Sequence, residues 1–139
     1  MKMEKEFCAA EKSGIAEKEF CSSKGNLKYA GTHLIIDLWK GENFSSVSQI
    51  KEILEKAVTA CGANLLQINL HEFSSSGGVS GVAIISESHI SIHTWPEYEY
   101  AALDIFVCGD VDPYDAIPVI KEGFHPERVQ VAELKRGIF

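Results

Sequence analysis

Side chains with nucleophilic or acid–base chemistry gather in residues 78–112, which read GVSGVAIISESHISIHTWPEYEYAALDIFVCGDVD. The segment offers hydroxyl groups from Ser80 and Ser88, an imidazole from His93 and a thiol from Cys108. A hydroxyl beside a base can act as a nucleophile, and a histidine or a thiol can transfer a proton near neutral pH. Each residue taken alone is more often structural, as a hydrogen-bonded histidine or a buried cysteine. Only their joint presence and order can indicate a catalytic site.

The charge of the chain limits what such a site could bind. The 139 residues include 13 basic and 20 acidic ones, a formal charge of −7, and the part from residue 28 onward carries all of it. No Lys or Arg lies between Lys56 and Lys121, so a nucleic-acid partner, whose phosphates need basic side chains, is not expected. The same stretch has no lysine that could hold pyridoxal phosphate. A site there should favour a cation, and a solvated acidic face is the alternative.

Cysteines, metal ligands and membrane segments add further exclusions. The cysteines are widely spaced and form no CxxC pair, which argues against a disulfide framework or a zinc ribbon: Cys8, Cys21, Cys61 and Cys108. Cys61 falls on the apolar stripe of a predicted helix and should belong to the core. His89 and His93 form an H-x3-H pair on a strand without a plausible third ligand, so no metal is expected. No apolar run approaches the ~20 residues of a membrane helix, and no signal peptide is visible. We therefore expect a cytoplasmic protein with no membrane partner.

The length suits one domain. We expect this domain to span residues 28–139. Residues 1–27 should form a flexible N-terminal extension, which repeats Glu-Lys-Glu-Phe-Cys at residues 4–8 and 17–21.

Hydrophobic periodicity predicts the element order β-α-β-β-β-β-α-β. The first helix should begin with Ser46 as its N-cap and end before Gly62. The second should begin after Asp112 and reach about Glu122, with Pro118 kinking or shortening it. The predicted strands cover residues 33–39, 64–73, 79–85, 89–94, 100–108 and 128–134, the last with Val129 and Val131 inward.

Two helices can cover only one face of such a sheet. We therefore expect an α+β fold, a two-layer α/β sandwich with a largely antiparallel sheet and both helices on one face. A second copy covering the other face would make an α-β-β-α sandwich.

The sequence contains the motif ISESHISIHTWPE, with GVSG before it, ALDIFVCGDVDP after it and GTHLIIDLW near the start. In these motifs it resembles the prokaryotic S-adenosylmethionine decarboxylases, and the resemblance extends over about residues 29–136. The resemblance implies a zymogen that cuts itself between Glu87 and Ser88 into a β chain, residues 1–87, and an α chain, residues 88–139. Ser88 would become a pyruvoyl group, which forms a Schiff base with S-adenosylmethionine and accepts electrons as CO2 leaves. The product would be the aminopropyl donor for spermidine biosynthesis. Neither a metal nor pyridoxal phosphate is implied, and a homodimer of cleaved protomers is expected.

Self-cleavage at a serine has a physical basis. A serine hydroxyl at a tight turn between strands can attack the preceding carbonyl and form an ester. Loss of the Cα proton then leaves dehydroalanine, which hydrolyses to a ketoacyl group. Ser88 and His93 are five positions apart and would face opposite sides of one regular strand. Ser88 should therefore lie in the turn, off the strand pattern, if the two are to meet.

Further roles follow from the resemblance, position by position. His93 matches the histidine that accepts a proton during processing, and Ser80 matches a serine that assists it. Cys108 matches the cysteine that protonates the decarboxylated carbon.

The resemblance also implies substrate contacts. Phe73 and Trp95 resemble aromatic residues of the nucleoside pocket, with Phe73 as the better candidate to stack on adenine. Glu97 resembles the carboxylate that binds the ribose hydroxyls. A sulfonium cation would suit such an acidic, aromatic pocket.

Two alternatives remain open. A pyruvoyl-dependent arginine or ornithine decarboxylase of the same fold would also act on a cationic amine. A catalytically silent homologue could bind a nucleoside or regulate a partner, although the presence of Ser88, His93 and Cys108 argues against it.

Overall fold

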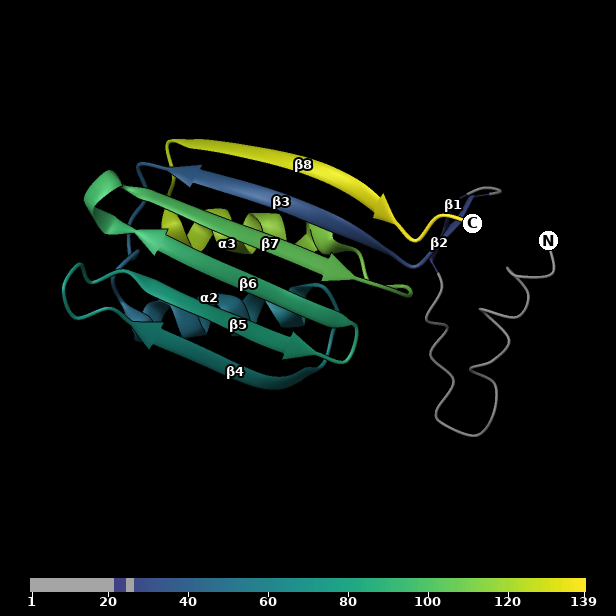
Figure 1. Ribbon diagram of the computed structural model, residues 1–139, viewed down its shortest axis with the longest axis horizontal. Coiled ribbons are helices and arrows are strands. Elements are labelled where there is room, and N and C mark those ends of the chain that lie inside the picture. Colours follow the sequence, from purple (N-terminus) through teal and green to yellow (C-terminus); the bar gives the residue numbers. More distant parts are fainter. Residues whose placement is uncertain (1–21, 25–26) are drawn as a thin grey trace.

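The computed structural model describes residues 22–24 and 27–139, which form one layer of helices against one six-stranded sheet (Figure 1). The extension expected over residues 1–27 therefore lies mostly outside the described residues. Two short strands, β1 (Ser22–Lys24) and β2 (Leu27–Tyr29), form an antiparallel ladder that the sequence did not predict. Among the described residues, no helix combines the length and apolar character needed to cross a membrane.

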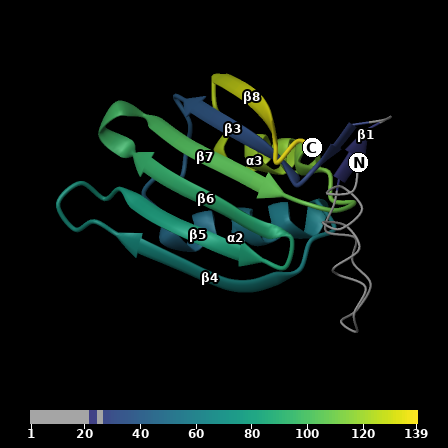
Figure 2. The same cartoon turned by 45° about the vertical axis from the view of Figure 1, so that its right-hand side comes forward.

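The main sheet has the strand order β4-β5-β6-β7-β3-β8, and each neighbouring pair is antiparallel. The strands match the predicted ones within a few residues: β3 (Gly31–Trp39), β4 (Leu65–Glu72), β5 (Val79–Ile85), β6 (Ser88–Trp95), β7 (Tyr100–Val107) and β8 (Arg128–Arg136). Both views show the helices α2 and α3 behind the sheet (Figures 1 and 2). The predicted α+β sandwich with both helices on one face is confirmed.

Helix α2 (Val47–Ala60) has the predicted boundaries. The Gln49 backbone N–H donates to the Ser46 side chain at 3.3 Å, which satisfies one of the unpaired donors of the first turn. Gly62, with φ 73°, follows the helix in the left-handed conformation that glycine adopts without a steric penalty.

The second helix is shorter at its start than predicted. A 3-10 turn, η3 (Pro113–Asp115), takes the first positions, and its Tyr114 N–H donates to the Asp112 side chain at 3.0 Å. Helix α3 (Ala116–Phe124) follows and ends beyond the predicted Glu122. Pro118 is thus the third residue of α3, where a backbone N–H has no intrahelical acceptor, so the proline does not shorten the helix.

The core lies between the helices and the sheet. On β7 the inward residues Ala101, Leu103, Ile105 and Val107 are all buried. Val129 of β8 packs against this core as predicted, but Val131 is 37% exposed. The reason is that β8 is an edge strand, with a neighbour on one side only.

The sheet face that no helix of the described residues covers is here called the open face. The strand registers place polar side chains of β5, β6, β7 and β3 on this face: Ser80, His89, Ser91, His93, Asp104 and His33. Large apolar side chains are also exposed there: Ile35, Ile84 and Leu134.

Candidate active site

The turn between β5 and β6 holds the peptide bond predicted to be cut. Ser86 and Glu87 form the turn, and Ser88 is the first residue of β6, at the right-hand end of these strands in Figure 1. Ser88 has φ 143°, a backbone conformation that residues other than glycine rarely adopt. The Glu87–Ser88 bond therefore lies beside a strained residue.

The Glu87 carbonyl oxygen accepts two hydrogen bonds from one residue. The Cys108 backbone N–H donates at 3.1 Å and the Cys108 thiol at 3.2 Å. The pairing of Ser88 with Val107 brings Cys108, the next residue, to this carbonyl. Donors aimed at a carbonyl oxygen stabilise the negative charge that forms there when a nucleophile attacks the carbon.

The Glu87 side chain anchors the same turn. Glu87 is 4% exposed, and its carboxylate accepts from the Asn64 backbone N–H at 2.9 Å and from the Ser86 hydroxyl at 2.7 Å. The Ser86 N–H in turn donates to the Asn64 carbonyl at 2.9 Å. Sequence reasoning missed Asn64 and Ser86, because such residues are common in turns of any function.

Ser80 and His93 form a pair on the open face. They are register partners on β5 and β6, and the Ser80 Oγ lies 2.9 Å from Nδ1 of the exposed His93. A hydroxyl hydrogen-bonded to an imidazole can pass a proton to it or receive one.

The structure does not bring Ser88 and His93 together within one chain. Ser88 pairs with Ile85, whereas His93 pairs with Ser80 at the opposite end of the β5–β6 ladder. Five residues of strand at ~3.3 Å each separate them by about 16 Å. The prediction that Ser88 lies in the turn, off the strand pattern, is therefore wrong: Ser88 is the first residue of β6 and pairs with both Ile85 and Val107.

The predicted substrate residues lie at the His93 end, on the left in Figure 1. Phe73 directly follows β4, Trp95 ends β6, and Glu97 belongs to the 3-10 turn η2 (Pro96–Tyr98). Phe73 is exposed and stands edge-on to His71, with ring centroids 4.7 Å apart. The predicted site residues thus form two groups at opposite ends of β6.

A half-buried tyrosine packs against Trp95. The rings of Trp95 and Tyr100 stack with centroids 5.3 Å apart, and the Tyr100 hydroxyl donates to Asp37. Burial, together with this aspartate, raises the pKa of Tyr100 to about 12. The phenol therefore remains neutral and keeps its hydrogen bond at physiological pH.

A third group, here called the His33–His89–Asp104 cluster, lies on the open face of β3, β6 and β7. Asp104 Oδ2 is 2.6 Å from His33 Nε2 and 2.9 Å from His89 Nε2, and the Ser91 hydroxyl donates to Oδ1. Burial tends to raise the pKa of Asp104, but the hydrogen bonds from Ser91, His89 and His33 outweigh it and lower the pKa below its usual value. Sequence reasoning paired His89 with His93, and only the register of three strands reveals its actual neighbours.

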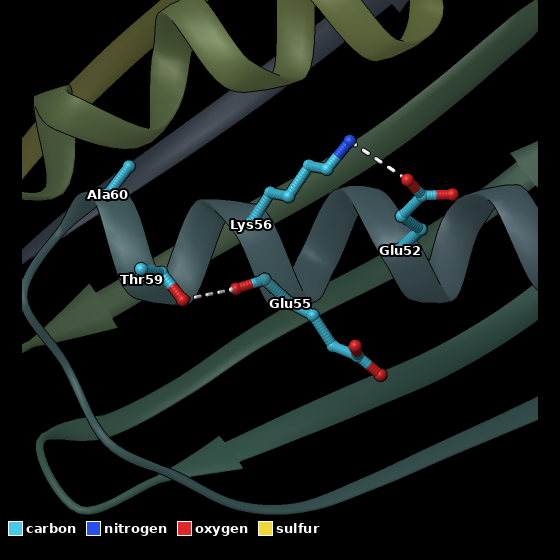
Figure 3. Close-up of a pocket in the computed structure, with 5 residues that line it drawn as sticks. All are labelled: Glu52, Glu55, Lys56, Thr59 and Ala60. Carbon is cyan, nitrogen blue, oxygen red and sulfur yellow. Dashed lines mark hydrogen bonds and ion pairs between the residues drawn. The ribbon is translucent and has the colours of Figure 1, made fainter.

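A hollow on helix α2 lies on the opposite side of the molecule from these groups (Figure 3). Its rim carries an ion pair between Lys56 and Glu52 at 2.9 Å, and the Thr59 hydroxyl donates to the Glu55 carbonyl at 3.1 Å. These contacts are typical of an exposed helix surface, and the hollow contributes nothing to the open face.

Fold and site together define a two-layer α+β protein with reactive side chains on an uncovered antiparallel sheet and a strained serine at one hairpin. The chain belongs to the S-adenosylmethionine decarboxylase family, whose model matches residues 32–137. It is 50% identical over 115 residues to a Methanococcus maripaludis protein named S-adenosylmethionine decarboxylase proenzyme, covering 81% of this chain and 93% of that one. A proenzyme of the same name from Thermomicrobium roseum is 44% identical over 113 residues, covering 81% and 97%.

A solved structure supports the same assignment. The crystal structure of the adenosylmethionine decarboxylase from Aquifex aeolicus matches with a TM-score of 0.70 at 33% identity. The match covers 78% of this chain and 92% of that one. The family expected from the motifs around Ser88 is thereby confirmed.

Proposed function

We propose that this chain is a self-processing, pyruvoyl-dependent decarboxylase that converts S-adenosylmethionine to CO2 and decarboxylated S-adenosylmethionine, the aminopropyl donor for spermidine biosynthesis. The observation that carries the proposal is the Glu87 carbonyl, which accepts two hydrogen bonds from Cys108 beside the strained Ser88. Family membership favours this substrate over arginine or ornithine, and the reactive groups favour an enzyme over a silent homologue. A cytoplasmic location stays a prediction.

The first step is an acyl shift from nitrogen to oxygen. The Ser88 hydroxyl attacks the Glu87 carbonyl carbon, the C–N bond breaks, and an ester links Glu87 to the Ser88 oxygen. The two Cys108 donors stabilise the oxyanion of this step. Cleavage also frees Ser88 from its positive φ, so strain is released as the bond breaks.

Elimination completes the processing. A base removes the Ser88 Cα proton, and the ester breaks. The main-chain carboxylate of Glu87 leaves as the new C-terminus of the β chain, and a dehydroalanine remains at the new N-terminus of the α chain. Water then hydrolyses this residue, ammonia is released, and a pyruvoyl group is left on the α chain. We assign the base to His93, whose Nδ1 is hydrogen-bonded to Ser80, the second residue proposed to assist processing.

The residues around Ser88 fit a pyruvoyl group. The Cys108 thiol already donates to the Glu87 carbonyl, which directly precedes Ser88. No lysine or arginine lies between Lys56 and Lys121 to hold a phosphate cofactor instead. When present, the pyruvoyl group supplies an electrophilic carbonyl that withdraws electrons from the substrate amine carbon. Cys108 would deliver a proton to the carbon that loses CO2, while Phe73, Trp95 and Glu97 would bind the nucleoside.

The distance between the two groups of site residues supports a homodimer. His93 lies about 16 Å along β6 from Ser88, too far for one chain to complete the site. Two copies packed by their open faces about a two-fold axis perpendicular to the strands would oppose the Ser88 end of one sheet to the partner's His93 end. The exposed Ile35, Ile84 and Leu134 would be covered by this packing. The dimer would be the α-β-β-α sandwich expected from the sequence.

The replacement Ser88→Ala tests the proposal directly. The variant lacks the attacking hydroxyl, so denaturing mass spectrometry should find one uncut chain, and no CO2 should be released from S-adenosylmethionine. Ser48→Ala is the matched control, because Ser48 is exposed on the first turn of α2, on the helix side of the sheet. The control should yield residues 1–87 and a pyruvoyl-blocked chain from residue 88.

A cleaved or active Ser88→Ala protein would refute the mechanism. Assays of the unaltered enzyme with labelled S-adenosylmethionine, arginine and ornithine would separate the substrates. CO2 release from arginine or ornithine alone would overturn the substrate assignment and leave the cleavage mechanism standing.

A further inference from the structure

We propose that the His33–His89–Asp104 cluster is a binding site for a divalent transition-metal ion of the zinc class, separate from the pyruvoyl chemistry. Its three potential ligand atoms, two imidazole nitrogens and one carboxylate oxygen, all lie within 4.8 Å of one another. Two imidazoles and one carboxylate form a donor set that protein zinc sites use, with a fourth position left for water.

The register of three strands creates this convergence. His33 on β3 and His89 on β6 are both register partners of Phe106 on β7, so they flank the same residue from opposite sides. Asp104 lies two residues before Phe106 and on the same face, within diagonal reach of both histidines. The site is therefore fixed by sheet pairing and needs no mobile loop.

The distances require only a small adjustment to admit the ion. The His33 and His89 nitrogens now lie 2.6 and 2.9 Å from Asp104 Oδ2, which are hydrogen-bond distances. Tetrahedral zinc with bonds of 2.0–2.2 Å needs ligand atoms about 3.4 Å apart. Each imidazole would thus move by less than about 1 Å, as its shared proton is replaced by the metal.

The surroundings of the cluster bear on ion binding. Ser91 donates to Asp104 Oδ1 and so orients the carboxylate with Oδ2 between the histidines, and hydrogen bonds of this kind hold metal ligands in place. In the single chain the side chains of His33, His89 and Asp104 are 15%, 35% and 22% exposed, and packing of two open faces in the proposed dimer would shield them further. Strands β6 and β7 contain no Lys or Arg, and the guanidinium of Arg136 on β8 lies over the Phe106 ring, 4.8 Å from its centroid.

The H-x3-H pair of the sequence is not part of this site. His93 lies four residues from His89 along β6, about 13 Å away, and is hydrogen-bonded to Ser80. The proposal thus revises the expectation that this chain needs no metal, but it adds no metal to the decarboxylation.

Titration of the chelator-treated full-length protein with Co2+ and Zn2+ tests the proposal. We expect one equivalent of Co2+ to give the visible absorption of a tetrahedral or five-coordinate site with nitrogen and oxygen ligands, and Zn2+ to displace it and raise the melting temperature. If a cysteine coordinated the Co2+ instead, the spectrum would contain a thiolate charge-transfer band in the near ultraviolet.

Four variants make the result specific. His33→Ala and Asp104→Asn should abolish the Co2+ spectrum, and the near-isosteric Asp104→Asn keeps the test valid if an alanine variant fails to fold. Ser91→Ala should weaken binding by about 10–100-fold, because it removes only the support of the carboxylate. His71→Ala is the control, since His71 is exposed on β4 and lies outside the cluster. Lack of saturable binding by the unaltered chain, or equal binding by His33→Ala or Asp104→Asn, would overturn the proposal and leave a hydrogen-bonded network only.

Discussion

The thiols of Cys61 and Cys108 lie in different surroundings, and these surroundings determine what each can do. Cys61 is 7% exposed at the end of α2, where burial and the charge of Asp115 raise its pKa to about 11. Cys108 is half-buried and donates to the Glu87 carbonyl. Since the thiolate is the reactive form of cysteine, Cys61 should be inert and Cys108 available for chemistry.

Alkylation of Cys61 at pH 8 checks this difference. A pKa raised from 9.0 to about 11 lowers the thiolate fraction about 100-fold. We expect iodoacetamide to modify Cys61 at least ~100-fold more slowly in the folded protein than in urea, measured by peptide mass spectrometry. A raised pKa favours the folded state below pH 9, and this contribution is lost as the pH rises toward 11. Equal rates in both states would show that Cys61 is not buried as described.

Single residues also show how far sequence reasoning reaches. The motif around Ser88 identifies the family, because its residues are consecutive in the chain. Asn64 and Ser86, which hold the Glu87 carboxylate, escape notice because the contacts of Asn64 with Ser86 and Glu87 span 22 and 23 residues of the chain. A side chain's type can be read from the sequence, but the partner that gives it a role often cannot.

Helices α2 and α3 pack at a contact that depends on one glycine. A Cβ at Gly123 of α3 would lie 2.4 Å from Cγ1 and 2.5 Å from Cδ1 of Ile53. Ile53 is itself buried on α2, so it has little room to move. The close approach of the helices therefore requires a residue without a side chain at this position.

We expect Gly123→Ala to destabilise the fold. Overpacking costs about 1–3 kcal/mol, whereas alanine adds only about 1 kcal/mol of helix propensity. Urea unfolding in the uncut Ser88→Ala background measures the effect on a single chain. Ile53→Ala alone should also destabilise, by about 2–5 kcal/mol, because it leaves a cavity. The double variant should lose less stability than the sum of the two, and strict additivity would contradict the proposed clash.

Whole elements were easier to predict than their exact boundaries. Alternating apolar residues define the six strands, and the Ser46 cap and Gly62 define α2, because these signals act over a few residues. The start of α3 differs because Pro113 and Asp112 favour a 3-10 turn before the helix. The exposure of Val131 depends on the order of strands in the sheet, which local periodicity does not contain.

At the scale of the whole molecule, the open face combines exposed apolar residues with His93 and the His33–His89–Asp104 cluster, whereas Ser88 lies at the other end of β6. The sequence places Ser88 and His93 five residues apart, so they were expected to meet only if Ser88 lay in the turn. The sheet instead holds them at opposite ends of one strand. Long-range register also assembles the His33–His89–Asp104 cluster, whose members are 71 and 15 residues apart along the chain. Neither feature can be read from spacing alone, because both depend on which strands become neighbours.

The proposed dimer predicts complementation between two inactive chains. A Ser88→Ala chain keeps His93, and a His93→Ala chain keeps Ser88, so each homodimer should remain uncut or nearly so. If each site combines Ser88 of one copy with the partner's His93, a heterodimer of the two variants contains one complete site. Coexpression with different affinity tags, followed by two-step purification and mass spectrometry, should find the His93→Ala chain cleaved before Ser88.

Two controls make this result decisive. The unaltered chain coexpressed with Ser88→Ala must be cut, which shows that tags and pairing do not block processing. The His93→Ala chain expressed alone fixes the background. An uncut His93→Ala chain within a purified heterodimer would refute the shared site, and sedimentation of the unaltered protein as a monomer would refute the dimer itself.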